Sequence, residues 1–136
     1  MIVWKDARHL TRKVYAASEP VPFRSDWGLR EQIRRASVSV MSNIAEGFER
    51  SSEAQFRYFL DIAKASCGEV RSQLYVALDQ QYIDSSTFAA LFQQAEILSR
   101  RLHRLAKAGS AHPIPPIQTG DSKFPPHRAD HHRNHS

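Results

Sequence analysis

Glu46 and Glu69 are the side chains of this sequence that best suit general acid–base chemistry. Two carboxylates can share such work when one holds a proton and the other does not. No other catalytic motif accompanies these two glutamates, since the sequence has no Ser/His/Asp set, no glycine-rich phosphate loop and no nucleophile elbow. We therefore predict that the protein is not an enzyme and has no catalytic residue.

Metal ligands are equally sparse in the part of the chain that has helical periodicity. Di-iron bundles take ligands from Glu-x-x-His pairs on facing helices, and the sequence contains no such pair. His9 and His103 are the only histidines before residue 110, and we expect both at the surface. The histidines after residue 110 lie in a segment without a predicted fold and so offer no fixed geometry. We predict no metal site and no cofactor.

Cys67 is the single cysteine of the 136 residues, so we expect no internal disulfide and no cysteine-based metal cluster. Its place among apolar residues predicts a buried, unreactive thiol. No basic leader precedes an apolar run, and no apolar run approaches the roughly 18 residues that span a bilayer. We expect a cytoplasmic protein without a membrane partner.

Basic residues give the chain a net charge of +5 and a pI near 9.7. The densest cluster is Arg100, Arg101, Arg104 and Lys107, at the end of a predicted helix. Cations there complement the helix dipole and solvate an exposed face. The alternative is a phosphate-binding patch. Residues that would extend such a patch are Arg30, Arg34 and Arg35, together with Arg8 and Arg12.

Four amphipathic segments carry these side chains. Apolar residues recur three and four apart over residues 4–17, 27–47, 53–81 and 85–109, which predicts helices. Helix-capping residues, Asp26, Ser52 and Asp84, precede the last three segments. No strand pattern is present. The sequence predicts an all-α, up-down antiparallel four-helix bundle over residues 1–109.

The second segment has a narrow, partly polar inner face. Small residues stand where an ordinary bundle would carry leucine: Ala36, Ser37, Ser39, Ser42 and Ala45. A helix of this kind approaches its neighbours closely and can hold Asn43 and Glu46 at a packed seam. Gly47 is expected to be either a helix C-cap or a point of close contact.

The chain changes character after Gly109. Five of the seven prolines and five of the seven histidines follow that residue. Only three bulky apolar residues occur there, Ile114, Ile117 and Phe124. Such a segment cannot bury enough surface to offset the entropy lost on ordering, so we predict a disordered tail over residues 110–136.

Several motifs resemble one known family. They are Trp4-x-x-Ala7-x-x-Leu10, Gly28-Leu29-x-x-Gln32-x-Arg34-Arg35-Ala36, Ser39-x-x-x-Asn43-Ile44-Ala45-Glu46-Gly47 and Ala63-x-Ala65-Ser66-x-x-Glu69. Over about residues 4–105 the chain resembles the four-helix-bundle proteins encoded in intervening sequences of bacterial 23S ribosomal RNA genes, also called S23 ribosomal proteins. The sequence departs from the family pattern at Ala65-Ser66-Cys67, where glycine-serine is common.

The resemblance implies a bundle that assembles as a ring-like homopentamer whose biochemical role is not established. It also singles out a polar set for packing or assembly: Asn43, Glu46, Gly47, Ser66 and Glu69. This set would form a polar site between the second and third helices, or fix their register and the approach of neighbouring subunits. Buried carboxylates need partners, so Glu46 and Glu69 are expected to pair with Arg34 or Arg35.

Two functional hypotheses follow. The first is a non-enzymatic homo-oligomer, pentameric by resemblance, that serves as a macromolecular interaction module. The alternative is a protein that binds RNA or a nucleoprotein through basic faces of the assembled ring. The family that the chain resembles has a distant relative in diversity-generating retroelements, an accessory protein that binds nucleic acid and a reverse transcriptase.

Overall fold

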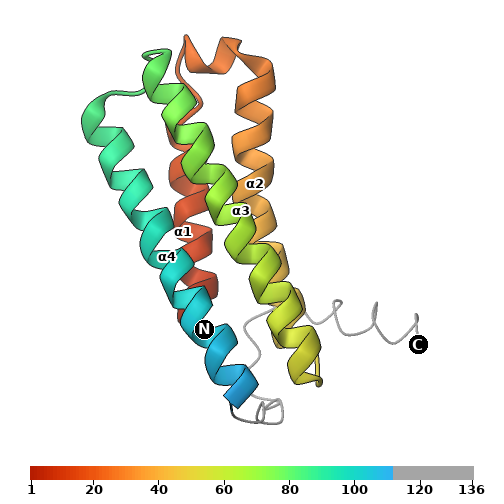
Figure 1. The fold of residues 1–136 in the computed structure, drawn as a ribbon. Helices are drawn as coiled ribbons and strands as arrows, with labels where there is room; N and C mark the ends of the chain where they lie inside the picture. The colour runs from red at the N-terminus through yellow and green to blue at the C-terminus, as the bar shows by residue number, and fades with distance from the viewer. Residues whose placement is uncertain (112–136) are drawn as a thin grey trace.

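A computed structural model describes residues 1–111 as four long α-helices and one short 3-10 helix, with no strand in that range (Figure 1). The elements are α1 (Ile2–Ala17), η1 (Phe23–Ser25), α2 (Trp27–Phe48), α3 (Glu53–Asp79) and α4 (Ser85–Ala111). This confirms the predicted all-α bundle. Helix α4 runs two residues past its predicted end at Gly109. The prediction of a disordered tail falls almost entirely outside the described residues.

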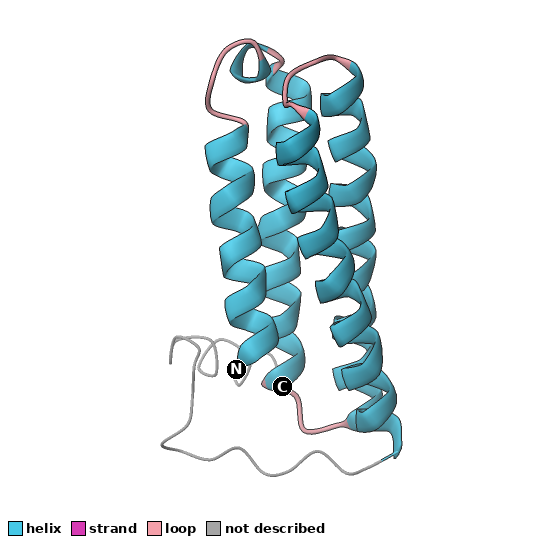
Figure 2. Ribbon diagram, turned by 90° about the vertical axis from the view of Figure 1, so that its left-hand side faces the viewer, coloured by secondary structure: helices cyan, strands magenta, loops and turns pink. Residues whose placement is uncertain are grey.

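The helices run up and down in chain order (Figure 1, Figure 2). Helix α3 packs along both α2 and α4, and α1 closes the bundle by packing against α2 and α4. The N-terminus and the end of α4 therefore lie at the same end of the molecule (Figure 2).

Side-chain caps begin three of the helices, as predicted. Asp26 Oδ1 accepts a hydrogen bond from the Leu29 amide at 3.1 Å, and Ser52 Oγ accepts from the Gln55 amide at 3.3 Å. Asp84 Oδ1 accepts from the Thr87 amide at 2.7 Å. Each cap satisfies a first-turn amide that has no partner within its helix.

The core is built from the apolar stripe of each helix. Its largest fully buried side chains are Leu10, Val14, Phe23, Ile33, Val40, Ile44, Leu60, Cys67, Val70, Leu74, Leu98 and Leu102. Trp4, Phe59, Leu78 and Leu105, which also follow the three-and-four spacing of apolar residues, are only half-buried. Ala77 and Ala106, their neighbours along the chain, are buried instead of Leu78 and Leu105.

The connection between α1 and α2 holds structure that the sequence pattern did not predict. Phe23 of η1 is buried and stacks on Tyr82, with 5.2 Å between ring centroids. The Tyr82 hydroxyl donates a hydrogen bond to Asp26 Oδ2 at 3.0 Å. The α1–α2 and α3–α4 connections are thereby joined at one end of the bundle.

Two contacts fix the antiparallel register of α3 and α4. Lys64 Nζ lies 3.2 Å from His103 Nδ1. Gly109 lies so close to Phe56 that a Cβ atom there would be 2.6 Å from Phe56 Cε2. Residues 56–64 of α3 therefore lie level with residues 103–109 of α4.

Candidate functional site

Three polar residues of the family-like motif form a hydrogen-bonded cluster between α2 and α3. Asn43 Nδ2 donates to the Ser39 carbonyl at 2.9 Å and to Ser39 Oγ at 3.0 Å. Ser39 Oγ lies 2.9 Å from Ser66 Oγ of α3, and either hydroxyl can be the donor. Ser66 is buried and the other two are half-buried. We call Ser39, Asn43 and Ser66 the polar seam; it joins two helices of one subunit.

Gly47 lies where α2 packs closely on α3. A Cβ atom there would lie 3.3 Å from Phe59 Cβ, 3.4 Å from the Phe56 carbonyl oxygen and 3.5 Å from Leu60 Cδ2. The residue is buried within α2, which continues to Phe48. Of the two predicted roles for Gly47, close contact is therefore the one that the structure supports.

Glu46 has a different partner from the one predicted. Its Oε1 atom accepts a hydrogen bond from Arg50 Nη2 at 2.6 Å, one turn along the same helix. The Arg50 guanidinium also lies over the Phe59 ring, 5.1 Å from its centroid. The expected pairing of Glu46 with Arg34 or Arg35 is wrong, since 11 or 12 helical residues separate them by about 17 Å along the axis.

Arg34 holds the end of α1 against α2. Its Nε donates to Ser18 Oγ at 2.8 Å and its Nη2 donates to Glu19 Oε1 at 3.0 Å. The guanidinium also lies over the Tyr15 ring, 4.4 Å from its centroid. The hydrogen bond from Arg34, and next the charge of Arg24, lower the pKa of Glu19. Arg34, predicted as a possible nucleic-acid contact, thus has a structural role.

Glu69 and Arg35 lie on a shallow polar groove between α2 and α3, with a volume of about 400 Å³. Its lining residues are Gln32, Arg35, Ala36, Ser39, Glu69 and Gln73. Glu69 and Arg35 are exposed and form no ion pair within residues 1–111. Glu46 does not line this groove, so the structure does not unite the two glutamates in one site.

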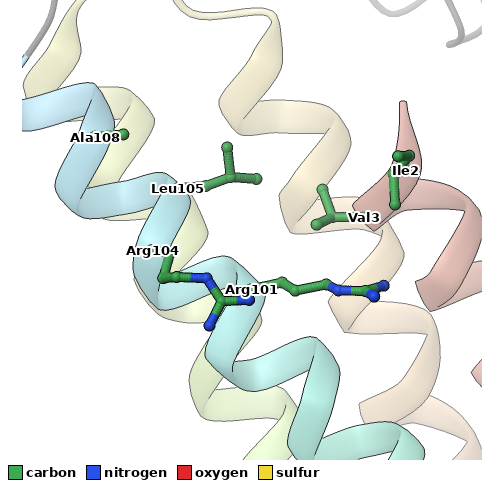
Figure 3. A pocket seen from close by; sticks show the side chains of 6 residues that line it. All are labelled: Ile2, Val3, Arg101, Arg104, Leu105 and Ala108. Atoms are coloured by element: carbon green, nitrogen blue, oxygen red, sulfur yellow. The ribbon is translucent and has the colours of Figure 1, made fainter.

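A second groove, the α1–α4 groove, lies between the start of α1 and the end of α4 (Figure 3). Its volume is about 460 Å³, and it is lined by Ile2, Val3, Arg101, Arg104, Leu105 and Ala108. Arg101 forms an ion pair with Asp6 of α1, whereas Arg104 has no ion pair within the described residues. Four of its six lining residues are apolar, and the other two are arginines.

The remaining predicted cations are distributed on both sides of the bundle. Arg100 pairs with Glu96 at 3.7 Å, and Lys107 is exposed further along α4. Arg34 and Arg35 lie on α2, and Arg34 contacts the far end of α1 from the α1–α4 groove. The structure therefore does not bring the α2 arginines together with those of α4.

The excess positive charge of the described chain is carried by α1 and α4. Helix α1 has four basic residues and one acidic residue, and α4 has the same balance. Helices α2 and α3 together have six of each. Since α1 packs on α4, the excess positive charge of the described chain gathers on one side of the bundle.

Other reactive groups in residues 1–111 are isolated. Cys67 is fully buried, and burial raises the pKa of its thiol to about 12, so it is an inert core residue. His9 and His103 are exposed. No group of three potential metal-ligating residues occurs in this range, and none of the described helices is long and apolar enough to span a bilayer.

Comparisons with known proteins agree with this fold. Residues 1–104 match the family described as 23S rRNA-intervening sequence protein. A crystal structure of a protein of unknown function from the S23 ribosomal protein family of Bacteroides thetaiotaomicron is similar, with a TM-score of 0.72 and 21% sequence identity. That match covers 78% of this chain and 96% of the other. No curated protein matches the sequence.

Proposed function

The chain belongs to the 23S rRNA-intervening sequence protein family, and we propose that it acts as a non-enzymatic bundle that associates with copies of itself. In this proposal the assembled surface binds another macromolecule. The two grooves described above are shallow and lack a nucleophile with an adjacent base, which supports binding over catalysis.

The observation that carries the proposal is the number of large apolar side chains left at the surface. Five of them keep half or more of their area exposed: Ile2, Val21, Trp27, Tyr58 and Tyr75. Aromatic residues are enriched at protein interfaces, where their rings bury a large area at little entropic cost. Burial between subunits would remove this surface from water.

A pentameric ring is the assembly that the resemblance implies. An odd-numbered ring needs a heterologous interface, in which one face of each subunit meets a different face of the next. The polar seam would serve this assembly indirectly, because Asn43 and Ser66 set how α2 lies against α3 within the subunit. Glu69, which is exposed, would act directly at the surface.

Light scattering coupled to gel filtration tests the proposal. We expect a single oligomer at micromolar concentration, and a stable monomer would refute self-association. Asn43→Leu tests the seam: helix content by circular dichroism should be kept while the oligomer mass changes. An unchanged mass would limit Asn43 to a role inside the subunit.

Nucleic-acid binding is a second candidate, supported by the concentration of positive charge on α1 and α4. Phosphate contacts release counterions, so affinity for a structured RNA should fall steeply between roughly 50 and 200 mM salt. Replacing Arg100, Arg101 and Arg104 by Gln should abolish binding, whereas Arg35→Gln on α2 should change it little. Absence of binding at low salt would remove this candidate.

A further inference from the structure

We propose that α3 of one copy docks on the α1–α4 groove of the next copy, with Tyr58 in the groove and Asp61 paired with Arg104. This inference rests on the proposed self-association and names the contacts that would produce it. It joins two different faces of the subunit, as a closed ring requires.

The exposed charges of the two faces are complementary. The exposed charged residues of α3 are all acidic, namely Asp61, Glu69 and Asp79, whereas its basic residues Arg57, Lys64 and Arg71 are half-buried. The exposed charged residues of α1 and α4, histidines aside, are all basic: Lys5, Arg8, Arg12, Lys13, Arg100, Arg101, Arg104 and Lys107. Opposite potentials favour docking of α3 on the α1–α4 side and disfavour contact between two α1–α4 sides.

Apolar surface is available on both faces as well. Tyr58 is 60% exposed, with its ring edge-on to Phe59 at 5.1 Å between centroids. Ile2 lines the α1–α4 groove and is 69% exposed, and Leu105 and Ala108 line the same groove (Figure 3). A tyrosine ring placed there would cover the most exposed of these apolar side chains and keep its hydroxyl at the rim.

The two faces lie at the same height along the bundle. The Lys64–His103 and Phe56–Gly109 contacts place Tyr58 and Asp61 level with the last three turns of α4, where Arg104 and Ala108 line the groove. Rotation about an axis parallel to the bundle preserves height. Neighbouring copies in a ring with such an axis would therefore hold Tyr58 and Asp61 at the height of the groove.

Asp61 and Arg104 are also free to pair with one another. Both are exposed, and neither forms an ion pair within residues 1–111. The neighbouring cations are already engaged, since Arg100 pairs with Glu96 and Arg101 with Asp6. Within residues 1–111, Arg104 is thus the groove cation with no acidic partner.

A charge exchange tests the contact in the full-length protein. Asp61→Arg and Arg104→Asp should each raise the dissociation constant of the oligomer by at least about tenfold, because each places like charges together. The combined variant should return it to within about threefold of the wild-type value. Sedimentation over a dilution series measures all four proteins.

Matched controls lie on the same helices, outside the contact. Asp79→Arg on α3 and Arg12→Asp on α1 should weaken association far less than the contact variants do, because salt screens charges that lie outside the contact, and thermal melts should show all variants folded. A wild-type monomer would overturn both the inference and the proposed function. An oligomer unaffected by Asp61→Arg, or not restored in the combined variant, would overturn the inference alone. Loss of RNA binding in Arg104→Asp with the oligomer intact would also overturn it, assigning the face to nucleic acid.

Covalent trapping gives an independent measurement. Tyr58→Cys combined with Ala108→Cys places one thiol on each face, and the buried Cys67 should not react. A short bis-maleimide should then join neighbouring copies into a ladder on a denaturing gel. Either single variant should give no ladder, and a double variant that also gives none would overturn the contact.

Discussion

The hydroxyl groups of Ser39 and Ser66 lie 2.9 Å apart between α2 and α3. Side chains this short can meet only because the two helices approach closely, and Gly47 allows the same approach two turns further along α2. Asn43 donates hydrogen bonds to the Ser39 hydroxyl and carbonyl. The Ser39 side chain therefore contacts both Asn43 of α2 and Ser66 of α3.

A double-mutant cycle on Ser39 and Ser66 should show energetic coupling. Each of Ser39→Ala and Ser66→Ala removes the shared hydrogen bond, which contributes about 1 kcal/mol to stability. The double variant should therefore be less destabilised than the sum of the single variants by about 0.5–1.5 kcal/mol. Denaturant unfolding at fixed protein concentration gives the free energies.

Ser42→Ala is the control for this cycle. Ser42 is exposed on the same helix, and its replacement combined with Ser66→Ala should give additive effects. Additive effects for Ser39 and Ser66 themselves would mean that their contact contributes nothing to stability.

Alanine should have opposite effects at two glycines in the helices. A Cβ atom at Gly68 would meet only Arg71 Nη2, at 3.5 Å, so Gly68→Ala should stabilise by about 0.5–1 kcal/mol through helix propensity. At Gly47 the new methyl group meets three atoms of α3 at 3.3–3.5 Å, and overpacking should exceed that gain. We expect Gly47→Ala to be destabilised by about 1 kcal/mol.

Thermal unfolding of the two variants beside the wild type checks this prediction. The melting temperature should rise for Gly68→Ala and fall for Gly47→Ala, by several degrees in each case for about 1 kcal/mol. A higher melting temperature for both variants would show that α2 and α3 can separate at Gly47 without cost.

The fold could be predicted from the sequence because its determinants are local. Apolar residues three and four apart define each helix, and Asp26, Ser52 and Asp84 cap the helices that they precede. The 3-10 helix was not predicted, because Phe23 is a single buried residue in a short connection and has no periodicity.

The candidate site was predicted only in part, because its ion pairs depend on distances through space. The polar seam follows from small residues at helical spacing. By contrast, Arg34 bonds to Ser18 and Glu19, which lie 16 and 15 residues earlier, just after the end of α1, and no sequence pattern marks that pairing. The Glu46–Arg50 pair does have a local pattern, an i,i+4 spacing, that could have indicated it.

The ion pair between Arg34 and Glu19 should make the stability of the bundle fall at acid pH. The hydrogen bond from Arg34 lowers the pKa of Glu19 below its ordinary value of 4.5, so the unfolded chain takes up this proton at a higher pH than the folded chain. The resulting stabilisation is complete above that ordinary value and is lost as the pH falls through the lower pKa of the folded state. Glu19→Gln should be less stable than the wild type at neutral pH, and the two melting temperatures should converge as the pH falls below 4.5 and through the lowered pKa of Glu19. The hydrogen bond from the Thr87 amide lowers the pKa of Asp84, so Asp84 also makes stability depend on acid pH. Asp84 is present in both proteins, and its effect therefore cancels when they are compared. Melting curves that stay parallel between neutral and acid pH would show that the Arg34–Glu19 contact does not stabilise the bundle.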